Sequence, residues 1–256
     1  MRPTVLAPSP VLRPFVKHFM AIETETGDAS TLLPDTSPVL AFRFEGMGEM
    51  ETRGQVAKVP GFALSGIRNS TRRMTHAKGG VFLTVFTEAG ASAFLREPLD
   101  EVFDDTVPFD CFVDGALLRP LEDHLFEASA HAGRAEAMER FLLTQLRNPA
   151  PGLDVDYAVA AIQRAHGNLR IEELARDVGL SQSALERRFR KAVGVTPKKL
   201  ASIARFQHAV RRHVDGVNFG EIAHEAGYFD QSHLVKDFKA FTGQAPETFF
   251  KTTTFW

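Results

Sequence analysis

Residues 171–197, IEELARDVGLSQSALERRFRKAVGVTP, and residues 219–246, FGEIAHEAGYFDQSHLVKDFKAFTGQAP, are two copies of one pattern. In each copy, apolar residues recur at positions i, i+3, i+4 and i+7, and a glycine follows at once, at Gly179 and Gly227. This spacing places the apolar residues on one face of a helix that ends at a left-handed glycine. A second amphipathic stretch then ends at a glycine and a proline in both copies. Each copy therefore predicts a helix-turn-helix unit.

The second helix of each unit is expected to be the recognition helix. Ser181 and Asp230 stand where the N-caps of these helices should lie. The faces opposite the apolar stripes combine hydrogen-bonding groups for base edges with cations for phosphates. We expect DNA binding by Gln182, Ser183, Glu186, Arg187 and Arg190 in the first unit, and by Gln231, Ser232, His233, Lys236 and Lys239 in the second. One such copy alone also fits an ordinary helical hairpin, but two matched copies favour a pair of DNA-binding units.

The stretch between the copies, residues 197–214, predicts one long helix. Pro197 suits its first position, and its apolar stripe contains Leu200, Ile203, Phe206 or Gln207, and Val210. A helix of about 16 residues spans about 24 Å. With the width of each unit added, it could hold two recognition helices about one DNA turn, roughly 34 Å, apart.

The C-terminal part resembles the AraC/XylS family of bacterial transcription regulators over about residues 155–250. The resemblance implies seven helices, with two helix-turn-helix units joined by a long helix. It also implies base contacts from Ser183, Glu186 and Arg187, and from Gln231, Ser232, His233 and Lys236. The residues that carry the resemblance are Glu173-Leu174-Ala175, Gly179-Leu180-Ser181, Leu185 to Arg190, Gly194 to Pro197, Ile222-Ala223, Gly227 to Leu234, Phe238-Lys239, Gly243, Pro246 and Phe249.

Residues 1–110 contain short apolar runs separated by turn residues, which predicts strands. Lys78-Gly79-Gly80 between two of these runs predicts a hairpin. We expect a small antiparallel β-barrel or sandwich, closed by two or three helices from about Leu117 to Leu146. The family resemblance implies a cupin-like sensor or dimerisation domain here. The expected strands are Val39–Phe44, Phe62–Leu64, Thr71–His76, Val81–Phe86 and Val102–Val107.

A break in helical pattern divides the chain. Asn148-Pro149-Ala150-Pro151-Gly152 has two prolines and a glycine and cannot continue a helix. The sequence therefore predicts an α+β protein with two domains, residues 1–150 and residues 151–256. The preceding helix, Arg134–Leu146, has an apolar stripe that serves either a homodimer contact or packing onto its own domain.

Composition and charge limit the class of protein. An apolar share of 44% and a net charge of −2 are typical of a folded chain. No apolar run is long enough for a membrane span, and no signal peptide is evident, so we expect a cytoplasmic protein without membrane contact. Residues 151–256 contain 15 basic and 12 acidic side chains, whereas residues 1–150 contain 15 and 20. This bias weakly favours nucleic acid as a partner of the C-terminal part.

The residues that could support enzyme chemistry are scattered. His18, His76, His124 and His131 form no His-x-His pair, so we expect no metal site. Some DNA-repair methyltransferases share this DNA-binding module and need several cysteines as zinc ligands and methyl acceptor, which Cys111 alone cannot supply. Because Cys111 lies beside Phe109 and Phe112, we expect it to be buried. We expect no catalytic residue and no cofactor. The alternative is an enzyme whose barrel active site is targeted to DNA by the helical part.

Two features of the N-terminal part leave alternatives open. Arg68, Arg72 and Arg73 form a basic cluster that is either a solvated strand face, which we favour, or a site for an anionic effector. Most of the 22 phenylalanines should lie in a core, although several before residue 112 could line a ligand cavity. The expected partners are promoter DNA and a second copy of the chain, with RNA polymerase and a small-molecule effector as further candidates.

Overall fold

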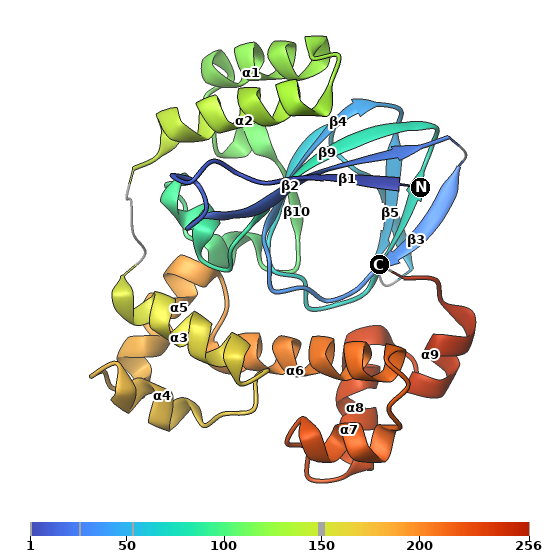
Figure 1. The fold of residues 1–256 in the computed structure, drawn as a ribbon, viewed down its shortest axis with the longest axis vertical. Helices are drawn as coiled ribbons and strands as arrows, with labels where there is room; N and C mark the ends of the chain where they lie inside the picture. Colours follow the sequence, from blue (N-terminus) through green and yellow to red (C-terminus); the bar gives the residue numbers. More distant parts are fainter. Residues whose placement is uncertain (1, 26, 53, 148–151, 256) are drawn as a thin grey trace.

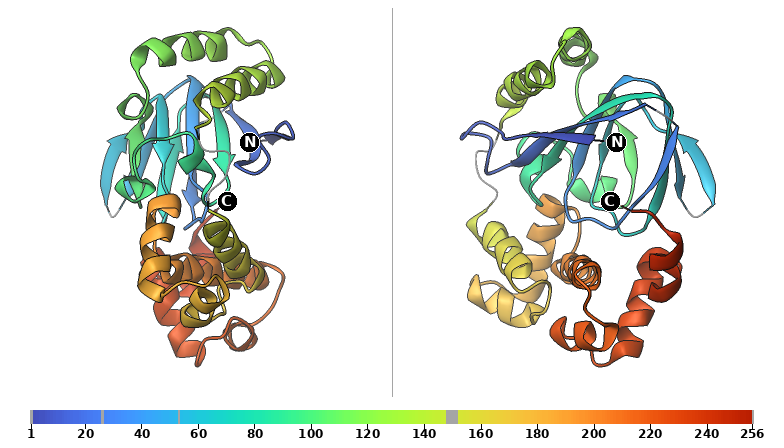
Figure 2. Two further views of the ribbon diagram at one scale, coloured as in Figure 1. Left: turned by 90° about the vertical axis from the view of Figure 1, so that its left-hand side faces the viewer. Right: turned by 45° about the vertical axis from the view of Figure 1, so that its right-hand side comes forward.

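The computed structural model of the chain has a β-rich part followed by helices (Figure 1). It describes residues 2–25, 27–52, 54–147 and 152–255. Figures 1 and 2 show the strands in the middle, with α1 (Gly115–Glu127) and α2 (His131–Gln145) on one side and the C-terminal helices on the opposite side. The α+β fold class expected from the sequence is confirmed. Of the predicted linker, only Gly152 lies within the described residues.

The strands form two antiparallel sheets, called the β-sandwich below. The larger sheet has the strand order β1-β2-β9-β4-β7-β10, and the smaller sheet has the order β3-β8-β5-β6. Of the two expected forms, the described strands adopt the sandwich and not one closed barrel. The strands are β1 (Arg2–Leu6), β2 (Val16–Thr24), β3 (Asp28–Leu32), β4 (Val39–Glu45), β5 (Gly48–Thr52), β6 (Gln55–Lys58), β7 (Phe62–Ser65), β8 (Arg72–His76), β9 (Gly79–Phe86) and β10 (Thr106–Pro108).

Alternation along the strands of the larger sheet separates a core from a cavity. Successive side chains of a strand point to opposite faces. On β4, Leu40 and Phe42 are buried in a core that includes residues of α1 and α2. Ala41 and Arg43 line a cavity on the other face. Most phenylalanines of this part fill the core, and among the described residues that line the cavity the only phenylalanine is Phe255. No phenylalanine before residue 112 is among the described residues that line this cavity, so the possible phenylalanine lining is not found here.

The predicted hairpin at Lys78-Gly79-Gly80 is also wrong. Strand β8 pairs with β3 and β5 in the smaller sheet, whereas β9 pairs with β2 and β4 in the larger sheet. The turn instead carries the chain between the sheets and packs closely on the turn between β4 and β5. A Cβ atom added to Gly79 would lie 2.2 Å from the carbonyl oxygen of Glu45. Local alternation predicts strands, but their partners depend on distant residues.

The predicted strand Val102–Val107 forms only in part. Residues Leu99–Val102 form a 3-10 helix, η2, and β10 begins at Thr106. Between them, Asp104 has a positive φ of 53°. Its carboxylate accepts hydrogen bonds from the backbone N–H of Asn69 at 2.9 Å and the hydroxyl of Ser70 at 3.1 Å. These bonds stabilise a bend where a strand was expected.

Cys111 is exposed, which contradicts its predicted burial. It lies in the 3-10 helix η3 (Phe109–Cys111), of which Phe109 is the buried residue. A short helix turns neighbouring side chains in different directions, so one apolar neighbour does not bury the next.

Residues 152–255 contain seven α-helices, in agreement with the expected number. The two repeats form the predicted helix pairs α4–α5 and α7–α8, and α6 connects them. The helices are α3 (Leu153–Arg164), α4 (Ile171–Asp177), α5 (Gln182–Val193), α6 (Pro197–Val214), α7 (Phe219–Glu225), α8 (Gln231–Thr242) and α9 (Pro246–Thr252).

The apolar stripe of α2 packs onto its own domain. Ala137, Met138, Phe141 and Leu142 are buried in the same core as the phenylalanines of the larger sheet. Of the two uses expected for this stripe, packing within the chain is the one observed. A homodimer contact would need another surface.

Candidate nucleic-acid interface

The predicted contact face of α5 is largely open to solvent. Gln182, Ser183, Arg187 and Arg190 are exposed, and Glu186 is half-buried. The amide of Gln182 donates a 3.1 Å hydrogen bond to the carboxylate of Glu186. On the opposite face, Leu185, Phe189 and Val193 are buried. The helix therefore presents two free guanidinium groups beside an amide–carboxylate pair.

The predicted contact face of α8 is exposed throughout. The opposite face of the helix is buried through Leu234, Phe238 and Phe241. The exposed residues of the contact face are Gln231, Ser232, His233, Lys236 and Lys239. The structure thus places all ten sequence-predicted residues on two helix faces, five on each.

Matched caps fix both recognition helices in the same way. The hydroxyl of Ser181 accepts a hydrogen bond from the N–H of Ala184 at 3.3 Å, and the carboxylate of Asp230 accepts one from the N–H of His233 at 2.8 Å. At the other ends, Gly194 and Gly243 have φ angles of 88° and 75° and cap the helices in the left-handed conformation. The predicted N-caps are therefore confirmed.

Helix α6 separates the two units. It has 18 residues, which corresponds to a length of about 27 Å. Figure 1 shows α3, α4 and α5 around one end of α6 and α7 and α8 around the other. The first unit shares a large core with α6, and Phe238 and Phe241 of α8 belong to the same core. A smaller cluster packs Ile222, Tyr228 and Leu234 of the second unit against Ala209 of α6. The long helix gives the two contact faces a defined separation.

The sequence-based selection missed one residue beside α8. Phe229 lies in the turn before the helix and is 94% exposed. Its neighbour Tyr228 is buried, and this burial raises the pKa of the Tyr228 phenol to about 12. An exposed phenylalanine beside a recognition helix can contact a thymine methyl group or a sugar. Its position in the turn, just before the N-cap Asp230, was the signal available in the sequence.

The 3-10 helix η2 and its N-cap Pro98 cover part of the α5 face. Pro98 and Asp100 border a depression whose other residues are Ser183, Glu186, Arg187, Arg190 and Lys191. The end of α5 packs closely on η2, because a Cβ atom on Gly194 would lie 2.7 Å from the carbonyl oxygen of Leu99. In this conformation the acidic residue Asp100 of η2 borders the same depression as the basic residues of the first recognition helix.

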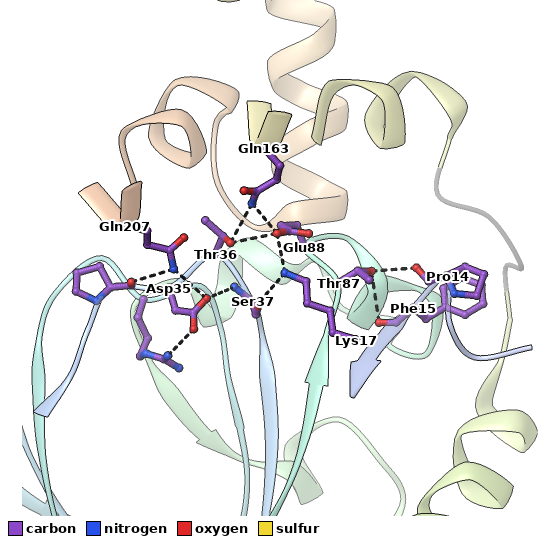
Figure 3. Close-up of polar contacts among 12 residues, drawn as sticks. Pro14, Phe15, Lys17, Asp35, Thr36, Ser37, Thr87, Glu88, Gln163 and Gln207 are labelled. Atoms are coloured by element: carbon purple, nitrogen blue, oxygen red, sulfur yellow. Dashed lines mark hydrogen bonds and ion pairs between the residues drawn. The ribbon is translucent and has the colours of Figure 1, made fainter. Parts of the chain in front are cut away.

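A polar cluster joins the β-sandwich to α3 (Figure 3). The buried carboxylate of Glu88 accepts hydrogen bonds from Lys17 at 2.9 Å, Thr36 at 3.1 Å and Gln163 of α3 at 2.6 Å. Hydrogen bonds to a buried charge are stronger than those between neutral groups. This cluster holds the first helix of the C-terminal part against the strands.

Helix α6 and the C-terminal segment also contact the β-sandwich. The amide of Gln207 donates to the carbonyl oxygen of Pro34 and to the carboxylate of Asp35, both at 3.3 Å. The backbone N–H of Thr31 donates to the carbonyl oxygen of Thr254 at 3.1 Å. Gln207 was one of two candidates for the apolar stripe of this helix, and Phe206 is the residue that occupies the buried position.

A cavity of about 670 Å³ lies inside the β-sandwich and extends to α6. This volume is in the range of small-molecule sites. Arg68 and Arg72 line it and are only 9% and 2% exposed. The favoured solvated-face interpretation is therefore wrong for these two arginines, although Arg73 is exposed. Strand alternation explains the difference, because Arg72 and Arg73 point to opposite sides of β8.

The part of the chain that the structure describes offers no group of three or more His, Cys, Asp or Glu side chains that could hold a metal ion. Among the same residues, no helix is long and apolar enough to cross a membrane.

Comparisons with known proteins agree with the helical geometry. Residues 174–252 match a family model described as a helix-turn-helix domain, and residues 4–108 match a domain of unknown function (DUF6597). No curated protein matches the chain.

Similar solved structures include the following three. ToxT from Vibrio cholerae has 12% identity, with 92% of this chain and 98% of that chain covered and a TM-score of 0.48. The C-terminal domain of AraT, a response regulator from Geobacillus stearothermophilus, has 23% identity, coverages of 41% and 89%, and a TM-score of 0.38. The AraC-like transcriptional activator CuxR has 14% identity, coverages of 87% and 91%, and a TM-score of 0.32.

Proposed function

We propose that this chain, whose residues 174–252 form a helix-turn-helix domain of the AraC type, is a sequence-specific DNA-binding transcription regulator. Helices α5 and α8 enter two successive major grooves on one side of the duplex. The domain type points to a regulator rather than to an enzyme.

One observation carries this proposal. Two helices with matched caps present exposed polar and basic faces at opposite ends of an 18-residue helix. A helical hairpin whose only role is to pack into the protein core does not require polar and basic residues on its outward face. DNA binding does require them, because base edges need hydrogen-bonding groups and phosphates need cations. DNA offers two equivalent major-groove sites about 34 Å apart, and α6 with a unit at each end matches that repeat.

The proposed contacts divide by chemistry. Amide and guanidinium groups suit base edges, so we assign base contacts to Gln182, Arg187 and Gln231. Lysines suit phosphates as point charges, so we assign phosphate contacts to Lys236 and Lys239. The two contact faces also include Ser183, Glu186, Arg190, Ser232 and His233.

The domain division and the partners belong to the same proposal. Residues 1–150 form a sensor and dimerisation domain, and residues 151–256 form the DNA-binding domain. The cavity in the β-sandwich supports a sensor role, because it is enclosed by the strands and reaches α6. Promoter DNA, a second copy of the chain and RNA polymerase are the proposed macromolecular partners, and the cytoplasm is the proposed location.

Selection from random duplex DNA with the full-length protein tests the proposal. We expect enrichment of two short conserved elements whose centres lie about 10 base pairs apart for each bound protomer. Binding should weaken steeply with salt, because phosphate contacts release counterions. The proposal fails if no sequence is enriched at any salt concentration at which the protein is folded.

A further inference from the structure

Arg43 lies at one end of the β-sandwich cavity. Val39, Ala41 and Arg43 alternate along β4 on the face that lines the cavity. Arg43 is opposite Val81 of β9, and Val39 is opposite Val85. Arg43 is four positions along β4 from Val39, a distance of about 13 Å. Val39 is at the end where β7 and β10 pair through Ser65 and Thr106.

Two other arginines that line the cavity, Arg68 and Arg72, are buried and have partners at that Ser65 end. Arg68 forms an ion pair with Asp35 at 3.2 Å. Arg72 donates to the Thr106 hydroxyl at 2.7 Å and lies 3.5 Å from the Asp104 carboxylate. The positive charge at this end of the cavity is therefore compensated within the protein.

Arg43 has no such compensation. Its Nε atom is buried and has no hydrogen-bond partner, and no described carboxylate lies within ion-pair distance of its guanidinium. Burial lowers the pKa of Arg43, with no opposing contribution from a carboxylate. Its guanidinium lies against the backbone of Gly48, where an added Cβ would be 2.5 Å from Nη2. A partly buried cation without a partner is costly, and an anion in the cavity would remove that cost.

The wall between the two ends is apolar. It is formed by apolar side chains of both sheets: Met20, Ala41, Ala63, Met74, Val81 and Leu83. Such a wall favours a ligand with an apolar body. Methionine side chains adapt to bodies of different shape.

The far end of the cavity is closed by the C-terminal part. Val210 and Val214 of α6 line it, together with Phe255, and Gln207, Arg211 and Asp215 add polar groups. A ligand long enough to reach from Arg43 to this end would contact the helix that carries both recognition units. The affinity for the ligand would then depend on the position of α6. Such a dependence is required for coupling between the cavity and the DNA-contact faces.

We propose that the cavity binds a small amphipathic monoanion, a carboxylate or sulfonate with an apolar body, and that Arg43 holds its anionic group. This inference deepens the proposed function, because it names the ligand class of the sensor. Of the described cavity arginines that are buried or half-buried, Arg43 is the one without a carboxylate partner, so its site selects one negative charge, and the apolar wall selects the body. The apolar end of the ligand lies against Val210 and Val214 of α6.

Calorimetric titration of the full-length protein without DNA tests this assignment. The probes are decanoate and naphthalene-2-sulfonate, with decan-1-ol as the neutral counterpart. We expect saturable binding of at least one anion at one site per chain, and at least tenfold weaker binding of decan-1-ol, since a charge-assisted contact is lost.

Variants separate the role of Arg43 from general charge. Arg43→Leu should weaken binding of the anion about tenfold or more, and Arg43→Lys should retain most of it. Arg73→Leu is the matched control, because Arg73 is exposed on the outer face of β8, and it should bind like the unchanged protein. Thermal unfolding without ligand checks folding, and Arg43→Leu should be at least as stable as the unchanged protein because a buried uncompensated charge is removed.

Three results would overturn the inference: no saturable binding of either anion, equal binding of decanoate and decan-1-ol, or unchanged anion binding by folded Arg43→Leu. Because the titration contains no DNA, its outcome is independent of the DNA selection. A protein that binds the anion without selecting DNA would contradict the proposed function and leave the ligand site standing.

Discussion

Gln163 of α3 donates a 2.6 Å hydrogen bond to the carboxylate of Glu88, which is 5% exposed in the β-sandwich. This bond joins two residues that are 75 positions apart in the sequence. It lies in the cluster that also includes Lys17 and Thr36 (Figure 3). The placement of the DNA-binding helices relative to the cavity therefore depends on a small number of identifiable polar contacts.

Replacing Gln163 by alanine tests the strength of this contact. We expect Gln163→Ala to lower the free energy of unfolding by about 1.5–3 kcal/mol, because the bond is made to a charged, buried acceptor. Gln55→Ala on the exposed strand β6 is the control and should change stability by less than about 0.5 kcal/mol. Urea unfolding followed by circular dichroism measures both. Equal stability of the two variants would show that the cluster contributes nothing to the docking.

The two C-capping glycines allow a matched comparison. Gly194 and Gly243 both have left-handed φ angles, so alanine at either should cost about 1–2 kcal/mol. At Gly194 the new Cβ would also meet the carbonyl oxygen of Leu99 at 2.7 Å, whereas at Gly243 nothing lies within 4 Å. We expect Gly194→Ala to cost about 1–3 kcal/mol more than Gly243→Ala, as an overpacked contact does. Chemical unfolding measures the difference, and equal costs would contradict the close packing of α5 on η2.

Protonation of His208 should weaken the protein as the pH falls. Burial lowers the pKa of His208 below 6.5, and His166, Arg211 and Arg212 act in the same direction. The unfolded chain therefore binds more protons than the folded chain just below pH 6.5, so stability decreases from there through the folded-state pKa. His208→Gln should reduce this decrease. Thermal unfolding between pH 7.5 and pH 5 measures it, and identical pH profiles for both proteins would refute the assignment.

Arg187 is the proposed base contact that is easiest to isolate. Arg187→Ala should weaken binding to a selected duplex by about 1–3 kcal/mol and relax the preference at one base position. Arg140→Ala is a suitable control, because Arg140 is exposed on α2, on the side of the strands away from α5 (Figure 1). Fluorescence anisotropy with single-base variants of the duplex gives both quantities. A uniform loss across all variants would reassign Arg187 to a phosphate contact.

The helical half was predictable because its signals are local. The spacing of apolar residues, the caps Ser181 and Asp230, and the glycine stops lie within a few turns of one another, and the structure confirms each of them. The two contact faces followed from the same periodicity. Phe229 escaped notice because its exposure depends on how the turn projects from the folded unit.

The β-sandwich was less predictable because its pairing is not local. The strand runs were recognised, but β8 and β9 join different sheets although only two residues separate them. The burial of Arg68 and Arg72 depends on Asp35 and Asp104, which lie more than 30 positions away. The cavity and its uncompensated Arg43 therefore could not be derived from the sequence pattern.

The central claim is that one chain places α5 and α8 in two successive major grooves. The most direct test compares the selected duplex with one in which five base pairs are inserted between its two conserved elements, which moves them to opposite faces of the helix. We predict that the five-base-pair insertion lowers the affinity of a single protomer at least about hundredfold, to the affinity expected when only one helix-turn-helix unit binds. An insertion of ten base pairs returns the two elements to the same face, and we expect it to restore only part of the affinity. Unchanged affinity after the five-base-pair insertion would contradict simultaneous binding by the two helices.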